Sequence, residues 1–381
     1  MSEIKVNSVK GVGATDAAIT INNSDGTCTA NITNRSNRNV IINGAMHVNQ
    51  RSSHGTAVTA TGDNQYLTVD RFKWRNYGGS GLASFTQVIG DYPSSEHRFS
   101  LKATCTTTNE VEDGFDSSIA YRVEGYDWQR FGWGRSNPNS ATISFWAKTS
   151  VAGVYSVSMR SGDGTRSQVQ ETPSLSANTW TKVKLTFTGD SNTAWVGSDY
   201  ATNGAGCLIE WNLGKSNSKN TSTLGSWISG NKVASDNQAR WIATSGATFF
   251  LTGVQVEVGD TATDFEHVTL AETKQRCMRY FQKAGARHCG ATEGTTQFRI
   301  LTALEPEMRA APTVTVRSGG IFNTRYAGDV NITNPTLSSP RSEARGVWTG
   351  IATSGRTAGV PVYGRMQQGD TGDFLSCDAE I

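Results

Sequence analysis

The feature that most constrains the fold is a strict alternation of apolar and polar residues in short segments. It is clearest in TKVKLTFTG, residues 181–189. Successive side chains of a β-strand point to opposite faces, so this segment predicts a strand with Val183, Leu185 and Phe187 buried and the lysines between them exposed. Similar segments recur at intervals of a dozen or more residues, with turn residues between them, which is typical of an antiparallel sandwich.

Composition supports a mostly β protein and excludes some classes. Among the 381 residues, 40 are glycine and only 18% are charged, which suits short strands joined by tight turns. The 10 Trp, 10 Tyr and 14 Phe require a packed core. With a net charge of +2, the protein has no general electrostatic attraction to nucleic acid. The sequence contains no apolar run of 18 residues, so we predict no membrane insertion. Six cysteines without a CxxC pair predict reduced thiols in a chain made in the cytosol.

The pattern divides the chain into four units. Residues 1–40 form a polar leader with too few apolar residues to fold alone, so we expect a segment that docks on other chains, with an unstructured leader as the alternative. In it, AAITI and CTANIT flank the turn signal NNSDG as in a hairpin. Residues 41–268 form the sandwich, beginning with NVIINGAMHVNQR, read as a strand broken at Asn43-Gly44. Residues 269–284 form a helical connector whose apolar face carries Leu270, Cys277, Met278 and Phe281. Residues 285–381 return to β patterns and form a smaller C-terminal β domain.

Catalytic signatures are lacking in the sequence. It contains no nucleophile elbow, no phosphate-cradling glycine loop and no HExxH motif, so we expect neither catalytic residues nor a cofactor. His288 and Cys289 with Cys277 lack the spacing of a zinc site, and we expect no bound metal there. The acidic loop NEVEDGFDSS has enough carboxylates for Ca²⁺, but a solvated loop is the preferred interpretation.

Aromatic residues in polar, glycine-rich surroundings indicate the candidate binding site. They form two clusters, Trp74/Tyr77 and Tyr126/Trp128/Trp133. Aromatic rings stack on sugars and also suit protein interfaces, and the neighbouring arginines supply polar contacts. We therefore predict that these rings lie on loops or on an open sheet face, where they bind a ligand. The alternative is that they fill the sandwich core or an interface between protomers. The predicted arginines are Arg75, Arg130 and Arg135.

Six segments in order carry a resemblance to a known family. They are NVIINGAMHVNQR, LTVDRFKW, YRVEGYDWQRF, ATISFWAKTS, NTWTKVKLTFTG and FFLTGVQVEVGDTATDFEH. Together they resemble bacteriophage tail-fibre proteins with a carbohydrate-binding-like jelly-roll domain, common in phages of marine and other aquatic bacteria. The leader is similar to the N-termini of such fibres in cyanophage-like viruses, and ETKQRCMRYFQK and FLSCDAEI resemble their later segments.

The resemblance implies a protein of the virion tail, assembled in the bacterial cytoplasm. It implies a homotrimer that attaches to other tail proteins through residues 1–40 and meets a host surface glycan or protein through later domains. It transfers no catalytic residue, and we expect a protein that is not an enzyme. Two alternatives stay open: a tailspike that cleaves surface polysaccharide, and a decoration or adaptor protein that binds only other virion parts.

Overall fold

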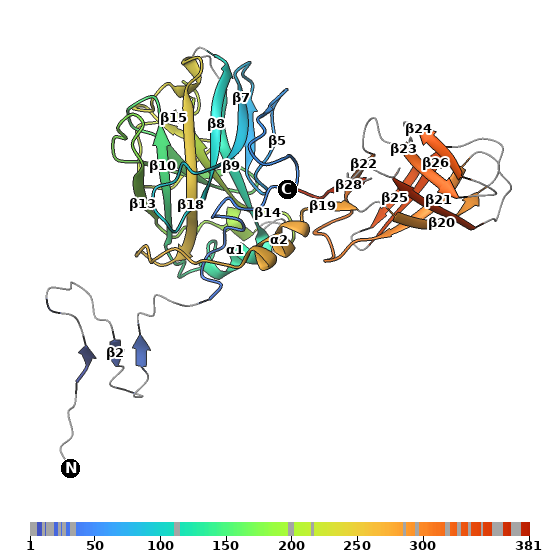
Figure 1. The fold of residues 1–381 in the computed structure, drawn as a ribbon. Helices are drawn as coiled ribbons and strands as arrows, with labels where there is room; N and C mark the ends of the chain where they lie inside the picture. Colours follow the sequence, from blue (N-terminus) through green and yellow to red (C-terminus); the bar gives the residue numbers. More distant parts are fainter. Residues whose placement is uncertain are drawn as a thin grey trace.

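A computed structural model gives the architecture of the chain (Figure 1). It describes residues 6–9, 12, 19–21, 24, 28–30, 36–109, 115–196, 202–214, 217–284, 287–293, 297–316, 321–325, 329–333, 337–343, 346–352, 361–366 and 375–381. The described strands form six sheets, and two of them face each other as a jelly-roll β-sandwich. The predicted mostly β fold class with an antiparallel sandwich is confirmed.

The first sheet of the sandwich has six strands, and neighbouring strands in it pair antiparallel. Its order is β13 (Thr181–Phe187), β10 (Ala141–Thr149), β18 (Thr248–Val258), β8 (Phe99–Thr107), β7 (Leu82–Ile89) and β4 (Val58–Thr59). The second sheet has seven strands in the order β16 (Ile228–Ser229), β12 (Arg166–Glu171), β11 (Ser156–Ser161), β14 (Ala205–Asn212), β9 (Asp116–Glu124), β6 (Lys73–Tyr77) and β5 (Gln65–Tyr66).

The core lies between these two sheets and follows the predicted alternation. Val183 and Phe187 on β13 are buried and Leu185 is half-buried, while Lys182 and Lys184 are exposed. The register of β13 is therefore the one expected from the sequence. From the facing sheet, the Trp211 ring meets the edge of a β10 phenylalanine with ring centroids 5.8 Å apart. Aromatic packing thus joins the two layers.

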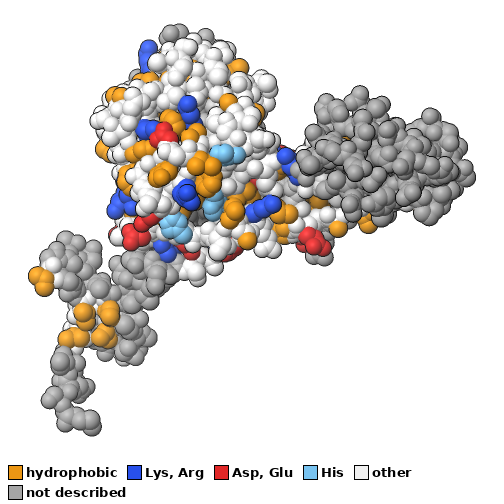
Figure 2. Space-filling model, viewed as in Figure 1, with side chains coloured by type: hydrophobic (Ala, Val, Ile, Leu, Met, Phe, Trp, Pro, Cys, Tyr) orange, Lys and Arg blue, Asp and Glu red, His pale blue; other side chains and the backbone are white. Residues whose placement is uncertain are grey.

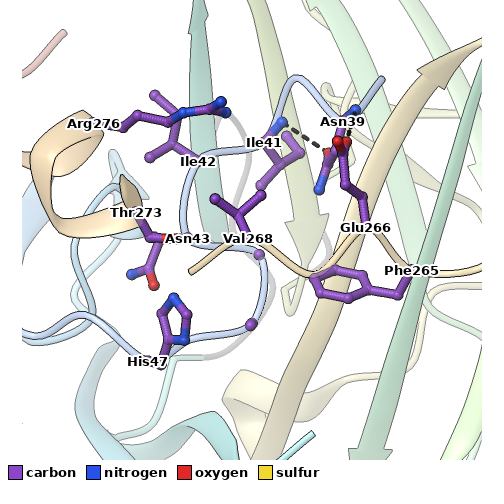
Figure 3. A pocket seen from close by; sticks show the side chains of 12 residues that line it. Asn39, Ile41, Ile42, Asn43, His47, Phe265, Glu266, Val268, Thr273 and Arg276 are labelled. Atoms are coloured by element: carbon purple, nitrogen blue, oxygen red, sulfur yellow. Dashed lines mark hydrogen bonds between the residues drawn. The ribbon is translucent and has the colours of Figure 1, made fainter. Parts of the chain in front are cut away.

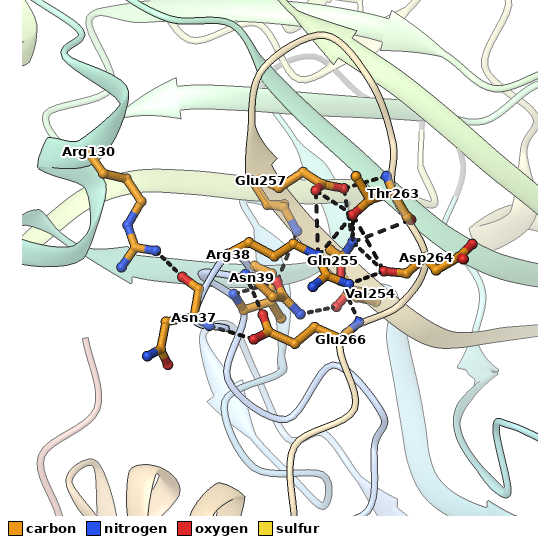
Figure 4. Close-up of polar contacts among 12 residues, drawn as sticks. Asn37, Arg38, Asn39, Arg130, Val254, Gln255, Glu257, Thr263, Asp264 and Glu266 are labelled. Carbon is orange, nitrogen blue, oxygen red and sulfur yellow. Dashed lines mark hydrogen bonds and ion pairs between the residues drawn. The ribbon is translucent and has the colours of Figure 1, made fainter. Parts of the chain in front are cut away.

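The polar residues of β18 are buried by the chain that follows the strand. Gln255 donates to Glu257 Oε1 at 2.9 Å, and Thr263 Oγ1 donates to Glu257 Oε2 at 2.7 Å. The Glu266 N–H donates to Gln255 Oε1 at 2.8 Å (Figure 4). The Asn39 side-chain oxygen accepts from the Val256 N–H of the same strand at 3.0 Å. The segment GDTATDFEH therefore returns over the outer side of β18 and satisfies its buried polar groups.

A β-bulge interrupts the pairing of β18 with β10. The register shifts between Ser144 and Trp146, where β18 contributes one extra residue. Gly253 lies at the bulge with a φ of +61°, in the left-handed region that favours glycine. A Cβ placed there would lie 2.9 Å from the His97 ring and 3.1 Å from the Trp146 ring. Both the backbone conformation and the neighbouring rings therefore require glycine.

We expect Gly253→Ala to lower the free energy of unfolding by about 1–3 kcal/mol, from backbone strain together with overpacking. Urea unfolding of the full chain measures this. Gly246→Ala is a matched control, because Gly246 has a φ of +72° but open space at its Cβ. A loss at Gly246 equal to that at Gly253 would show that the two rings contribute nothing.

Two predicted elements differ from the structure. The helix α2 covers Leu270–Met278, and the chain then forms β19 (Phe281–Ala284), so the predicted helix is wrong after Met278. Strand pairing overrides helical propensity there, since β19 pairs with β28 (Leu375–Asp378). The segment NVIINGAMHVNQR is not a strand; it forms turns in which the Asn43 amide donates to the Val48 and Asp70 carbonyls. Leu270, expected on the buried face of the helix, is 58% exposed.

The shorter elements complete the sandwich and its ends. They are α1 (Gly125–Trp128), the 3₁₀ turns η1 (Gln129–Phe131), η2 (Thr193–Val196) and η3 (Trp241–Ala243), and the parallel pair β15 (Asn220–Thr221) and β17 (Ala234–Ser235). Both α1 and α2 lie at the same end of the sandwich (Figure 1). None of the helices within the described ranges is long and apolar enough to cross a membrane.

The leader contains β1 (Ser8–Val9), β2 (Ile19–Ile21) and β3 (Cys28–Ala30) in a small antiparallel sheet. The pairing of β2 with β3 confirms the predicted hairpin. The C-terminal unit holds a seven-stranded sheet of β24 (Asp329–Thr333), β23 (Ile321–Arg325), β27 (Pro361–Met366), β20 (Arg287–Glu293), β21 (Gln297–Ala303), β26 (Gly346–Ala352) and β25 (Leu337–Glu343). Its smaller sheet joins β19, β28 and β22 (Thr313–Val316). The domain boundaries and the trimer remain predictions.

The surface matches the near-neutral charge of the sequence. On the face drawn in Figure 2, lysines and arginines are scattered, and uncharged side chains and backbone cover most of the described part. Single apolar side chains are exposed between them.

Candidate functional site

The three predicted tryptophans are not on the surface. Trp74, Trp128 and Trp133 are all 0% exposed, so the prediction that they lie on loops or an open face is wrong. Trp74 belongs to β6, where strand alternation turns it toward the core against Phe85. The polar neighbours that suggested a loop are the outward-facing residues of the same strand.

Trp128 and Trp133 form an aromatic anchor with other buried rings. The Trp128 and Phe131 rings stack with centroids 4.1 Å apart, and Trp133 meets Trp128 edge-on at 4.9 Å. Trp133 also contacts Trp195 and Trp227, with centroids 4.7 and 4.9 Å away. This anchor fixes the segment of α1 and η1 to the sandwich, and the intervening residues of the segment point outward.

The two predicted tyrosines are exposed, Tyr126 by 57% and Tyr77 by 53%. The Lys219 ammonium lies 3.9 Å from the centroid of the Tyr77 ring, so that ring already has a cationic neighbour. Tyr126 follows Gly125 at the start of α1, where its N–H donates to the Thr202 carbonyl at 3.1 Å. Its backbone is held in place while its ring is presented to solvent.

The three predicted arginines have different settings. Arg75 is bound in the structure to Asp116 at 3.2 Å and Glu210 at 3.0 Å, so it is not a surface contact. Arg135 is exposed and lines none of the pockets described below. Arg130 lies on the rim of a pocket that also contains Tyr126. Of the eight predicted site residues, only Tyr126 and Arg130 line this pocket.

That pocket, here called the Tyr126 pocket, has a volume of about 420 Å³. It lies at the α1–α2 end of the sandwich, between the start of α1, the end of α2 and residues 37–42. Ligand pockets in proteins commonly occupy about 300–1,000 Å³. The residues that give it chemical character are Glu124, Tyr126, Asp127, Arg130, Arg276 and Arg279.

Asn37 holds the rim of the Tyr126 pocket together. Its carbonyl accepts from Arg130 at 2.6 Å, and its side-chain oxygen accepts from Arg276 at 2.6 Å. Its N–H donates to Glu266, which also accepts from the Asn39 N–H (Figure 4). The rim is therefore attached both to α2 and to the network around β18.

Glu124 provides a buried acceptor in the wall of the pocket. The residue is only 3% exposed, and its Oε2 accepts from Arg279 at 3.2 Å. Its Oε1 is buried and has no hydrogen-bond partner. A buried carboxylate oxygen without a donor is unfavourable, so a ligand hydroxyl that reached it would be stabilised. The exposed Tyr126 ring, this oxygen and the arginine N–H groups together suit a polyhydroxylated ligand.

Sequence reasoning missed Glu124, Arg276 and Arg279. Glu124 lies within YRVEGYDWQRF, directly before the predicted Tyr126, but a single glutamate at a strand end carries no distinctive signal. The two arginines come from the far end of α2, about 150 residues later in the chain. Only the tertiary fold places these three side chains in one pocket.

A second cavity beside α2 is too small for such a ligand. It is lined by Asn43, His47, Phe265, Thr273 and others, and its volume is about 20 Å³ (Figure 3). A single water needs about 10–15 Å³ measured in this way. This cavity therefore has room for a water molecule and not for a sugar.

Metal chemistry finds no support in the part of the chain that the structure covers. Within those residues there is no group of three or more His, Cys, Asp or Glu side chains arranged to hold an ion. Asp116 of the acidic loop binds Lys219 at 2.9 Å, while Glu110, Glu112 and Asp113 lie outside the described residues. The four described cysteine side chains, Cys105, Cys207, Cys277 and Cys377, are free thiols as predicted.

Comparisons with known proteins give weak structural likenesses. No protein-family model and no curated protein matches the sequence. The chain is similar to the enzymatically active domain of bacteriophage CBA120 tailspike protein 4, with 13% identity and a TM-score of 0.28 over 58% of this chain and 21% of the other. It is also similar to a xylan-binding CBM22-1 domain from Paenibacillus barcinonensis, with 13% identity and a TM-score of 0.25 over 55% of this chain and 99% of the other. A family 11 carbohydrate-binding module from Clostridium thermocellum is similar too, with 13% identity and a TM-score of 0.26 over 57% of this chain and 100% of the other. Likenesses this weak assign no ligand or activity to the chain.

Proposed function

We propose that this protein binds a glycan in the Tyr126 pocket and does so without catalysis. The observation that carries the proposal is the exposed Tyr126 ring beside a buried carboxylate oxygen of Glu124 that has no donor. Aromatic faces pack on the apolar faces of sugar rings, and Tyr also offers a hydroxyl for polar contact. Arg130, Arg276 and Arg279 supply donors for sugar oxygens around this centre.

The biological setting follows from the sequence resemblance to bacteriophage tail fibres. In this proposal the chain is a homotrimeric fibre protein of the virion tail. Residues 1–40 attach it to other tail proteins, and the sandwich contacts glycan on the host envelope. The Tyr126 pocket carries the recognition step, and no nucleic acid or membrane insertion is involved.

The affinity of the full chain for glycans tests the proposal. A glycan array identifies the retained sugar, and titration calorimetry measures its affinity for wild type and Tyr126→Ala. We expect the variant to lose roughly 1–2 kcal/mol of binding free energy, about a 5- to 30-fold loss of affinity, because it removes the stacking surface. The melting temperature should be unchanged, since the ring is more than half exposed.

Tyr77→Ala is the matched control, because this ring is almost equally exposed and lies outside the Tyr126 pocket. Its affinity for the same glycan should equal that of wild type. Equal losses in the two variants, or a loss at Tyr77 alone, would place the binding site elsewhere.

Two competing functions predict different results in the same experiments. A polysaccharide-degrading tailspike would release reducing sugar from host envelope, whereas the proposed protein releases none. A decoration or adaptor protein would bind other virion proteins but no glycan on the array, and Tyr126→Ala virions would adsorb normally to host cells.

A further inference from the structure

The outer face of the seven-stranded sheet of the sandwich (β16 to β5), turned away from the core, carries a group of charged side chains. Residues paired across the sheet share a face, and Lys73, Arg75, Arg122, Glu210 and Arg160 belong to this one. Lys219 and Asp116 complete the charged group. By the same pairing Glu124 and Glu171 also lie on this face, where Glu124 accepts from Arg279.

Glu210 and Asp116 are already bound by three of the cations. Glu210 accepts from Arg160 at 2.7 Å and from Arg75 at 3.0 Å. Asp116 accepts from Arg75 at 3.2 Å and Lys219 at 2.9 Å. Lys73 and Arg122 are left without a carboxylate partner on this face.

Arg122 is the less satisfied of the two. Its Nε is buried and has no hydrogen-bond partner, and its side chain makes no ion pair in the described part of the chain. Lys73 is buried, and its Nζ donates to the main-chain oxygen of Ile381, the last residue of the sequence, at 3.2 Å. An arginine with a free Nε–H presents a planar fork that matches both oxygens of a carboxylate.

Both side chains line a pocket of about 420 Å³, here called the Arg122 pocket. Its other walls include Asn64, Gln65 and Tyr66, and Asp378, Glu380 and Ile381 of the C-terminal segment. Arg51 also lines the pocket but is bound to Asp378 at 2.8 Å and Glu380 at 3.2 Å. Glu380 also accepts from Arg71, so Lys73 and Arg122 are the basic side chains in the lining that have no aspartate or glutamate partner.

We propose that the Arg122 pocket binds the carboxylate of a small acidic ligand, with Arg122 as the bidentate donor and Lys73 as the second cation. This site is separate from the Tyr126 pocket, and the inference does not rest on the proposed function. A carboxylate there would give Arg122 the anionic partner that it lacks among the described residues.

The protonation of Lys73 gives the site a pH signature. Burial, and then the neighbouring Arg122 and Arg75, lower the pKa of Lys73 to about 6, although Glu210 and Glu380 act in the opposite direction. Tyr66, whose ring lies 5.4 Å from the ammonium, completes its surroundings. At pH 7.5 Lys73 is therefore largely neutral in the empty pocket. A bound anion favours the charged form, so binding takes up a proton and tightens as the pH falls toward 5.5.

Titration calorimetry of the full chain with glucuronate, and with glucose as the uncharged comparison, tests this inference. We expect glucuronate to bind with proton uptake at pH 7.5, seen as a heat that changes with the ionisation enthalpy of the buffer. Arg122→Gln should weaken binding at least tenfold, while Arg135→Gln leaves it unchanged. Lys73→Met should abolish the proton uptake.

Several results would overturn the inference. One is glucuronate binding that is unaffected by Arg122→Gln, and another is no detectable binding at millimolar concentration to a folded wild-type protein. Glucose binding as tight as glucuronate would remove the role of the charge. If sulfate bound more tightly than glucuronate, the site would be one for a tetrahedral anion and not for a carboxylate. Loss of glucuronate binding in Tyr126→Ala would show that the ligand occupies the other pocket.

Discussion

Trp133→Ala should lower the free energy of unfolding by about 3–5 kcal/mol, the range measured when large buried aromatic side chains are deleted. The Trp133 ring is fully buried and contacts four other aromatic rings, and its Nε1 donates to the Asn139 carbonyl at 2.6 Å. Its removal leaves a cavity and an acceptor without its donor. Chemical denaturation of the full chain measures the loss.

The control for this variant is Trp180→Ala. Trp180 is partly exposed and lies over Phe250 at the edge of the sandwich, so its removal should cost clearly less. If Trp133→Ala unfolded at the wild-type denaturant concentration, the aromatic anchor would not support the fold, and the buried position of this ring would be wrong. If Trp133→Ala kept the wild-type stability but lost glycan affinity, the Trp133 ring would belong to the binding site.

Glu210→Ala should lower the free energy of unfolding by a similar amount, because it breaks buried ion pairs. Glu210 is buried and is the shared acceptor of Arg160 and Arg75. Removing one partner of a buried ion pair leaves uncompensated charge and typically costs about 3–5 kcal/mol. The exposed pair of Glu272 and Arg276 offers the control, because Glu272→Ala should change stability by less than about 0.5 kcal/mol.

The pH dependence of the free energy of unfolding should also depend on the Glu210 carboxylate. Burial alone would raise the pKa of Glu210, but Arg160 and Arg75 outweigh it and lower the pKa to about 2. Its contribution is therefore complete above the unfolded pKa near 4.5 and is lost as the pH falls through about 2. Wild type should lose up to about 3 kcal/mol over this window through Glu210 alone. A wild-type profile parallel to that of Glu210→Gln across the window would contradict the assignment.

The strands of the core could be predicted because their alternation is local. The register of β13 follows directly from its own residues, and the structure has the same one. The same rule explains the error at Trp74. Its neighbours Lys73 and Arg75 are polar because they belong to a charged sheet face. Without knowledge of the partner strands, a segment with such polar neighbours is indistinguishable from a loop. A polar neighbourhood therefore does not distinguish a loop from a strand whose outer face carries buried ion pairs.

The lining of the Tyr126 pocket could be predicted only in part. Tyr126 and Arg130 were identified from an aromatic cluster, and the structure places them in the Tyr126 pocket, while the tryptophans of the same cluster anchor the segment. The remaining walls come from residues 37–42 and from the end of α2. Contacts between segments so distant in sequence depend on the closure of the sandwich, which no local pattern encodes.

Hydrogen exchange of the full-length protein, with and without the glycan retained on the array, tests the central claim most directly. The Tyr126 pocket predicts slower exchange in residues 124–130 and 276–280 when glycan is bound, because these segments form its walls. The strands around Tyr77 should exchange at the same rate in both states. Protection confined to residues 285–381, with none in 124–130, would contradict the account and place glycan recognition in the C-terminal unit.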